Sequence, residues 1–336
     1  MNELWNEPKR RTGCVVVCSD GNWAWQSAFV LMRSMAMDTG QELDHHLYLA
    51  GIADQRVLDI LPPEIRLHRI DDMPEACSLA ERGHIPAASL LRLAALNELG
   101  RCYDRVIYLD GDVFQAWGTL ADLLKIDMGG VPLAAVRDRL QWPVDARPYY
   151  RPYLQELAAR SGVDRLDYFN SGVMMIDGPA YVDGGITAEA LAFISANHEA
   201  LRFVDQSALN AVLAGRWCEL SPGWNWQMSR IVFSLTAGRR PRMIHFTGPN
   251  KPWLDRFRLL PSEAFDAMMD FLAGNGLTSL LPDEAPNHFD FRTMERVRVR
   301  KLSDWTADAS ARRETVKNYL NRGDFADLAA GLHSFG

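Results

Sequence analysis

Two aspartates at the end of a short apolar run are the first residues that could do chemistry. Residues 106–109 are typical of a buried strand of a parallel sheet, and Asp110, Gly111 and Asp112 follow directly. In an extended chain both carboxylates leave the same face, and a glycine between them lets a ligand approach the backbone. Paired carboxylates repel each other unless a cation lies between them, and a hard divalent ion that also bridges phosphate oxygens suits this pair. The alternative interpretation is a solvated Asp–Gly turn.

Composition narrows the class of protein. The chain has 336 residues, of which 48% are hydrophobic and 24% charged, so it can bury the core of one large globular domain. A net charge of −7 argues against nucleic acid as a partner, because that usually requires a basic face. The five cysteines form no CxxC pair, which indicates small buried residues in a reducing compartment and not a disulfide framework or a zinc site.

The first twelve residues predict no export signal. They contain Glu3, Glu7 and Pro8 and have no apolar core. No run of the sequence reaches the roughly 18 apolar residues that a membrane span needs. We therefore expect a cytoplasmic protein, with peripheral attachment to the inner face of the cytoplasmic membrane left open.

Strand and helix patterns alternate over the first 110 residues. We expect strands at 14–18, 46–49, 65–70 and 106–109, and helices at 24–37, 54–61 and 86–99, the last ended by Gly100. This alternation is typical of a doubly wound α/β sheet, in which ligands bind at the carboxyl ends of the strands. Asp20 and Asn22 follow the first strand, so they are expected at the same edge as Asp110 and Asp112.

The pattern beyond residue 112 is mixed. We expect strands at 133–136 and 243–246, a polar turn running into a strand within 168–177, and helices at 188–197, 206–213 and 262–272. The sequence is accordingly divided into a catalytic domain at 1–255 and a partly basic helical region at 256–336.

Six segments, in order, resemble glycosyltransferase family 8, the retaining nucleotide-sugar transferases that include bacterial lipopolysaccharide galactosyl- and glucosyltransferases and glycogenin. They are Ser-Asp-Gly-Asn-Trp at 19–23, Arg92, Tyr-Leu-Asp-Gly-Asp at 108–112, Tyr-Phe-Asn-Ser-Gly-Val at 168–173, Asp-Gln-Ser-Ala-Leu-Asn at 205–210 and His-Phe-Thr-Gly-Pro-Asn-Lys-Pro-Trp at 245–253. The resemblance spans about residues 14–254 and implies a GT-A fold, a Rossmann-like mixed central sheet flanked by helices with a C-terminal helical appendage. It also implies transfer of a hexose, glucose or galactose, from UDP-glucose or UDP-galactose to a saccharide acceptor such as a glycan or lipopolysaccharide.

The resemblance assigns a metal site. His245 becomes the third ligand beside Asp110 and Asp112, and an imidazole suits Mn²⁺ better than Mg²⁺. Lys251 is implied to stabilise charge on the leaving phosphate, and the backbone at Gly248 to approach the pyrophosphate.

Further residues are implied to hold the donor. The implied donor-binding residues are Cys18, Asp20, Asn22, Arg92, Asp110, Gly111, Asp138, Asn170, Gly248 and Lys251. Helix capping is the alternative role for Asp20, Asn22 and Asp205, and a structural salt bridge is the alternative for Arg92.

The reacting centre is implied to lie beside Asp205 and Gln206, which are the candidate catalytic residues together with Lys251. An amide such as Gln206 is a poor nucleophile, so a double displacement through a covalent intermediate is disfavoured. We expect same-face attack, in which the acceptor hydroxyl enters as UDP leaves and a leaving phosphate oxygen takes its proton.

The acceptor side is less defined. Trp217, Trp224 and Trp226, with Trp142 and residues 149–150, form either a carbohydrate platform or part of the core. Residues 287–322 hold nine Lys or Arg against five Asp or Glu, which favours either an anionic membrane surface or a solvated helix or dimer contact.

Two other classes of protein remain alternatives. A sugar-phosphate nucleotidyltransferase usually carries a basic Gly-rich loop after its first strand, and residues 19–22 contain no basic residue. A non-catalytic glycan-assembly or binding module is the other alternative.

Overall fold

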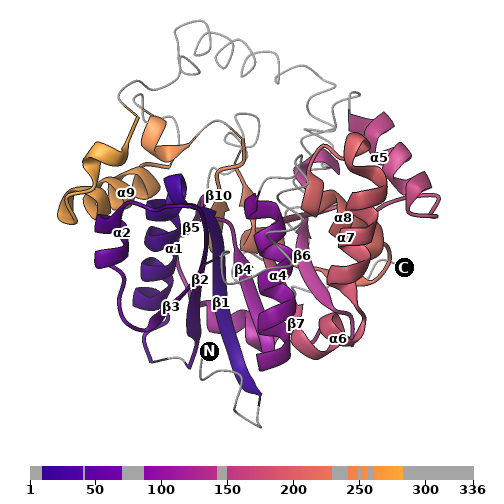
Figure 1. Ribbon diagram of the computed structural model, residues 1–336, viewed down its shortest axis with the longest axis horizontal. Coiled ribbons are helices and arrows are strands. Elements are labelled where there is room, and N and C mark those ends of the chain that lie inside the picture. The colour runs from indigo at the N-terminus through magenta and orange to yellow at the C-terminus, as the bar shows by residue number, and fades with distance from the viewer. Residues whose placement is uncertain are drawn as a thin grey trace, which may run out of the picture.

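A computed structural model describes residues 10–40, 42–69, 87–141, 150–228, 241–248, 251–255 and 261–282 (Figure 1). Its main sheet has seven strands in the order β3-β2-β1-β4-β7-β6-β8. Their bounds are β1 Arg11–Asp20, β2 Asp44–Ala50, β3 Ile65–Arg69, β4 Tyr103–Leu109, β6 Leu133–Arg137, β7 Phe169–Asp177 and β8 Trp217–Glu219.

The first half of the sheet is parallel and the second half is mixed. Strands β3, β2, β1 and β4 run parallel, with α1 (Ala24–Met37), α2 (Gln55–Asp59) and α4 (Ala87–Cys102) between them in the chain. Strand β7 is antiparallel to both β4 and β6, and β6 is parallel to β8. The predicted mixed Rossmann-like sheet is confirmed, and β1 and β4 end side by side at one edge.

Alternate side chains of β1 enter two separate cores. Val15 and Val17 pack on the side of α1 and α9 (Ser262–Gly274), whereas Val16 packs on the side of α4. The second core also contains residues of α5 (Tyr150–Arg160), α7 (Ile186–Asn197) and α8 (Val204–Val212). Because both faces of the sheet are covered, its central strands are apolar on both sides.

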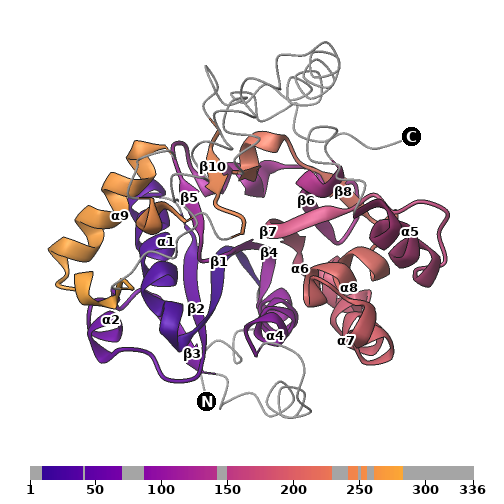
Figure 2. The ribbon, with the colours of Figure 1, turned by 90° about the horizontal axis from the view of Figure 1, so that it is seen from above.

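A second sheet has three short strands, of which only the one at 243–246 was predicted from the sequence. It consists of β5 (Val113–Gln115), β10 (Met243–His245) and β9 (Trp226–Gln227), in the order β5-β10-β9. Figure 2 shows β10 on the opposite side of β4 from α4. Strands of two or three residues are too short to show a periodic pattern. In register, His245 lies opposite Val113, the residue after Asp112.

Gly100 does not end the helix that precedes β4, as the sequence predicted. Helix α4 continues to Cys102, and a Cβ added at Gly100 would lie 3.0 Å from Val182 Cγ2 and 3.3 Å from the Gly178 oxygen. Both neighbours belong to α6 (Gly178–Asp183). The glycine therefore allows two helices to approach closely instead of stopping one of them.

The predicted polar turn within 168–177 is also wrong, because β7 begins at Phe169. Asn170 and Ser171 lie inside this strand, and the register of β6 against β7 shifts between Ala135 and Val136. An irregularity of this kind re-aims side chains without ending a strand. Asn170 and Ser171 therefore lie at the end of the sheet where Asp110 lies.

Several predictions fall on residues that the structure does not describe: Trp142, Tyr149, Cys77 and the basic segment 287–322, with its predicted membrane contact. Across the described ranges, no helix is long and apolar enough to cross a membrane. Helix α9, placed by the sequence in a separate helical region, packs on α1 through Phe271 and Phe29, whose ring centroids are 5.3 Å apart.

A buried pair of histidines joins β2 to β3. His46 Nδ1 lies 2.9 Å from His68 Nε2, and His46 Nε2 lies 3.0 Å from the Tyr103 hydroxyl, which donates to Asp44. Burial, and then the neighbouring His68 and Arg66, hold the pKa of His46 well below its usual range. His46 therefore stays neutral in the folded protein where an unfolded histidine takes a proton.

This difference predicts a loss of stability in mild acid. Above about pH 6.5, the pKa of an unfolded histidine, His46 is neutral in both states, so pH does not change its contribution to the free energy of unfolding. Below that pH, the unfolded chain binds a proton that folded His46 does not, which favours the unfolded state. Between pH 7 and pH 5 we expect this group to lower the free energy of unfolding by about 1 to 2 kcal/mol, measured by urea denaturation. His46→Gln should flatten the fall, and His198→Gln, at an exposed position, should not. Equal pH slopes for the wild type and His46→Gln would contradict the assignment.

Candidate active site

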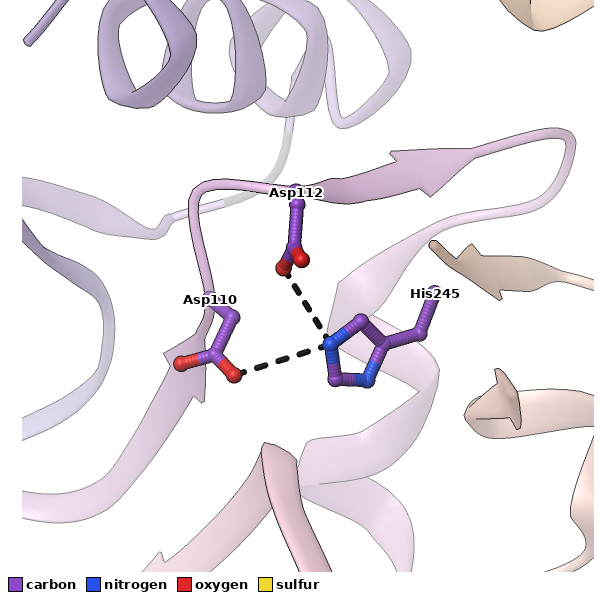
Figure 3. Close-up of side chains that lie close together, drawn as sticks. All are labelled: Asp110, Asp112 and His245. Atoms are coloured by element: carbon purple, nitrogen blue, oxygen red, sulfur yellow. Dashed lines mark ion pairs between the residues drawn. The ribbon is translucent and has the colours of Figure 1, made fainter. Parts of the chain in front are cut away.

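The two aspartates lie in a turn and not in an extended strand. Asp110 follows β4, and the Val113 N–H donates to the Asp110 backbone oxygen over 3.3 Å, so the chain reverses into β5. The geometry predicted for the pair was therefore wrong. The carboxylates still converge, because His245 enters between them from β10 (Figure 3).

His245 completes a three-residue cluster. Its Nε2 lies 3.1 Å from Asp112 Oδ1 and 3.6 Å from Asp110 Oδ2. One ligand atom from each residue lies within 4.8 Å of the others. The Phe246 N–H also donates to the Asp112 backbone oxygen over 3.1 Å, which ties β10 to the turn. Two carboxylates and an imidazole form a donor set that fits a divalent cation.

Gly111 has a packing role in the same turn. A Cβ at this position would lie 3.0 Å from Ser27 Oγ of α1. The missing side chain therefore lets the turn approach α1. Its predicted use, close approach of a ligand to the backbone, stays a prediction.

A lysine neutralises the second aspartate. Lys251 Nζ contacts Asp112 Oδ2 and donates to the Phe246 oxygen over 2.7 Å. Burial opposes ionisation of Asp112, but Lys251 and His245 outweigh it and hold the pKa of this carboxyl well below its usual range. Asp112 is therefore ionised at neutral pH. Gly248, between His245 and Lys251, has φ +78°, a conformation that favours glycine.

Arg92, from α4, bridges two aspartates. Its Nη2 lies 2.6 Å from Asp110 Oδ1, and its Nη1 lies 2.6 Å from both Asp205 Oδ2 and Ser171 Oγ. The guanidinium carbon also lies 4.4 Å from the centre of the Tyr108 ring. The salt bridge considered from the sequence is therefore present, and contact of Arg92 with a donor stays a prediction.

The predicted N-cap role of Asp205 is wrong. Helix α8 begins at Val204 with Phe203 at the N-cap, so Asp205 lies in the first turn. Its Oδ2 pairs with Arg92. A carboxylate is favourable both at the N-cap and in the first turn of a helix, because at either position it lies near the positive end of the helix dipole.

Amides and a carboxylate form a buried cluster beside Arg92. Asp138 Oδ2 accepts from Asn170 Nδ2 over 2.9 Å and from Gln206 Nε2 over 3.1 Å. Gln206 Oε1 accepts from the backbone N–H of Ser171 over 3.0 Å and from its hydroxyl over 3.1 Å. The structure therefore brings Asp138, Asn170, Asp205 and Gln206 together with the Asp110 turn.

The residues after β1 lie at the same edge of the sheet. Asp20 accepts from the Asn22 backbone N–H over 2.9 Å and caps the short helix η2 (Gly21–Trp23). The helix it was predicted to cap, α1, has Trp23 at its N-cap, so the cap by Asp20 or Asn22 predicted for that helix is wrong. Asn22 is exposed. Cys18 is buried, and burial raises the pKa of its thiol well above the usual range, so it is a neutral group.

Gly172 and Tyr108 have roles that sequence reasoning missed. A Cβ at Gly172 would lie 2.1 Å from His245 Cε1 and 2.9 Å from Asp110 Oδ2, so only glycine fits between them. The Tyr108 hydroxyl donates to Asp110 Oδ1 over 2.8 Å. Both residues occur in the segments that resemble the family, but their contacts exist only once the strands are assembled.

Of the two alternatives for the tryptophans, a place in the core is confirmed for Trp224 and Trp226. Trp224 and Trp226 are 3% and 0% exposed and belong to the core on the α1 side. Trp217 is half-buried, with its ring centre 5.1 Å from that of Phe169. Indole rings suit a core as well as a sugar face, and here the strands turn them inward.

Comparison with known proteins identifies the family. Residues 14–256 match the family described as "Glycosyl transferase family 8". The chain belongs to glycosyltransferase family 8. This membership confirms the resemblance seen in the sequence and sets aside the nucleotidyltransferase alternative.

Two bacterial proteins are among the relatives in sequence. General stress protein A of Bacillus subtilis is 28% identical over 263 residues, which are 71% of this chain and 86% of that protein. The lipopolysaccharide 1,2-glucosyltransferase of Escherichia coli is 25% identical over 230 residues, 64% of this chain and 61% of that protein.

Solved structures share the fold. The galactosyltransferase LgtC, in complex with donor and acceptor sugar analogues, has a TM-score of 0.57 at 23% identity, over 81% of this chain and 98% of that one. The bifunctional glycosyltransferase WbbM has a TM-score of 0.61 at 21% identity, over 88% of this chain and 52% of that one. These similarities agree with the GT-A fold that the family 8 resemblance implied.

Gly172 yields a test of the site's packing. In Gly172→Ala, the methyl group must displace His245 or Asp110, and we expect a loss of about 1 to 3 kcal/mol in the free energy of unfolding, measured by urea denaturation. Gly274→Ala is the matched control, because a Cβ there meets nothing within 4 Å. If both variants are equally stable, the close contact at Gly172 is not a constraint.

Proposed function

We propose that this family 8 member is a retaining hexosyltransferase that moves glucose or galactose from a UDP-sugar to a saccharide acceptor. The observation that carries the proposal is the convergence of Asp110, Asp112 and His245 at the end of β4, with ligand atoms within 4.8 Å of one another. Lys251 and Gln206 lie in the same network of contacts. The rest of the arrangement supports binding of a diphosphate at this edge.

The three side chains fit a divalent cation. Two carboxylates and one imidazole nitrogen suit Mn²⁺, with Mg²⁺ as the alternative that prefers oxygen ligands alone. Asp112 is held in its ionised form, which a metal ligand requires. When bound, such an ion would supply positive charge to the diphosphate of the donor.

Fixed cationic and backbone groups of the chain would bind the rest of that diphosphate. Lys251 is anchored on the Phe246 oxygen and beside Asp112, which limits its freedom. An ammonium held in place stabilises charge on the leaving phosphate without reorganisation during the reaction. Gly248, with φ +78°, would offer its backbone N–H to a phosphate oxygen. Arg92 would complete this set from α4.

The side chains beside the proposed reacting centre already make hydrogen bonds or ion pairs within the protein, and this supports same-face displacement. Gln206 Oε1 already accepts from Ser171, and an amide is a poor nucleophile. Asp205 is in an ion pair with Arg92, and both oxygens of Asp138 accept hydrogen bonds. A covalent intermediate would require one of these carboxylates to leave its partners. The chain would instead orient the acceptor hydroxyl on the face that UDP leaves, and a phosphate oxygen would take the proton.

The nucleoside end of the donor would lie along β1. Cys18 and Asp20 end this strand, Asn22 follows it, and β1 is the neighbour of β4 in the sheet. We retain the division of the chain into a donor-binding domain at 1–255 and a helical region at 256–336. The family match over residues 14–256 supports that boundary, although α9 packs on α1.

Names of the relatives suggest the donor sugar and the acceptor. One relative is named a lipopolysaccharide 1,2-glucosyltransferase and one solved structure a galactosyltransferase. Glucose and galactose are therefore the donor sugars to assay first, and a lipopolysaccharide-type glycan is the acceptor to assay first.

Removing either carboxylate tests the metal site. Asp110→Asn and Asp112→Asn should each lower transfer from UDP-glucose or UDP-galactose by at least about a hundredfold, measured as UDP release with Mn²⁺. Circular dichroism should show an unchanged fold. Asp164→Asn, at an exposed position, should keep full activity. A folded double variant that is fully active in chelator would exclude the metal assignment.

Lys251 is expected to act on the chemical step. Lys251→Met should lower kcat about a hundred- to a thousandfold with a smaller change in the KM for the donor, because the lost interaction strengthens as the glycosidic bond breaks. Steady-state kinetics over a range of donor concentration measure both constants. A change in KM alone would assign Lys251 to ground-state binding only.

A further inference from the structure

Asn225 lies between Trp224 and Trp226, for which the sequence left open an acceptor platform or the core, and its side chain points at His245. It occupies the turn between η7 (Pro222–Trp224) and β9 and is 0% exposed. Its Nδ2 donates to Asn170 Oδ1 over 2.8 Å, and its Oδ1 lies 3.0 Å from His245 Nδ1. Nothing in the family match or in the proposed function assigns this residue.

The orientation of the Asn170 amide is determined by its neighbours. The backbone N–H of Gly172 can only donate, and it lies 3.0 Å from Asn170 Oδ1. On the other side, Asp138 Oδ2 lies 2.9 Å from Asn170 Nδ2 and accepts from it. Two independent contacts therefore place the oxygen of Asn170 toward His245 and its amino group toward Asp138.

That orientation determines the next two groups. Asn170 Oδ1 is an acceptor, so the Asn225 atom beside it must be the amino nitrogen, and the Asn225 oxygen then faces His245. His245 Nδ1 thus meets two acceptors, Asn225 Oδ1 at 3.0 Å and Asn170 Oδ1 at 3.1 Å. A ring nitrogen between two acceptors carries a proton, so Nδ1 is protonated. Nε2 faces Asp112 Oδ1 at 3.1 Å and Asp110 Oδ2 at 3.6 Å, where a bound cation would replace any proton on that nitrogen.

We propose that Asn225 is a positioning residue that, with Asn170, holds a proton on Nδ1 of His245 and thereby directs Nε2 at Asp110 and Asp112. As a statement about metal affinity, the inference rests on the proposed function, in which Nε2 is a ligand. As a statement about the imidazole, it rests on hydrogen bonds alone. Histidines that bind metals commonly donate their other N–H to a fixed acceptor, which orients the ring.

Close packing makes this hydrogen-bonded chain rigid. His245 Cε1 occupies the space where a Cβ of residue 172 would lie, so the ring cannot move toward β7. His245 and Asn225 are 4% and 0% exposed, which leaves little water to compete for Nδ1. Trp224 and Trp226 anchor the turn on both sides of Asn225, and this is the use the structure makes of that aromatic segment.

The ring proton can be tested by NMR without any metal. In the full chain labelled with ¹⁵N-histidine, a long-range ¹H–¹⁵N correlation spectrum separates protonated from unprotonated ring nitrogens. The chain has eight histidines, and the signals missing in His245→Gln identify this one. We expect Nδ1 of His245 to be protonated in the wild type. An unprotonated Nδ1 would overturn the inference.

Mn²⁺ binding tests the consequence, with binding measured by electron paramagnetic resonance of the free ion and without donor or acceptor. Asn225→Leu should raise the Kd for Mn²⁺ about ten- to a hundredfold, because one acceptor of the Nδ1 proton is lost. Trp224→Phe, which alters the same turn and keeps the Asn225 side chain, should change it less than about threefold. An unchanged Kd in folded Asn225→Leu would overturn the positioning role.

The two proposals fail in different ways. A wild type that binds no Mn²⁺ would contradict the metal site of the proposed function, and the NMR spectrum would still decide the state of His245. If Asn225→Leu does not fold by circular dichroism, the spectrum of the wild type decides the inference by itself.

Discussion

Balance of charge at one end of the sheet is the constraint on which the site depends. Asp110 and Asp112 place two carboxylates in one turn, and each is neutralised by a different part of the chain, Arg92 from α4 and Lys251 from the segment after β10. A charge withdrawn from water without a partner costs several kcal/mol, so the turn is stable only when these segments meet. The same negative charge is what would attract a divalent cation.

Close packing around His245 is the second constraint, because this ring must reach both carboxylates. His245 reaches the carboxylates because β10 pairs with β5, directly after Asp112, and because Gly172 of β7 has no side chain. The small sheet and the main sheet therefore approach each other closely at this glycine. A side chain at position 172 would separate the ligands, which explains why this glycine, within an otherwise well-filled strand, cannot be exchanged for a larger residue.

Failures of the sequence interpretation have a common physical cause. Trp224 and Trp226 suit a sugar face or a core, Asp205 suits a helix N-cap or an ion pair, and Gly100 suits a helix end or a close helix contact. Each residue type has two favourable environments, and local sequence does not distinguish them. Predictions that depended on periodicity alone did better, since helix α1 has the predicted bounds, Ala24–Met37.

By itself the sequence determined the α/β alternation, the family and the residue types available for a metal and a diphosphate, because these depend on local pattern and on residue order. Only the tertiary structure decided how they meet. Lys251 contacts Asp112 across 139 residues of chain, Arg92 joins Asp110 to Asp205, and Asn225 reaches His245 from a turn between two core tryptophans. Such contacts depend on the pairing of distant strands and on which face each side chain takes, and neither is encoded within a single segment.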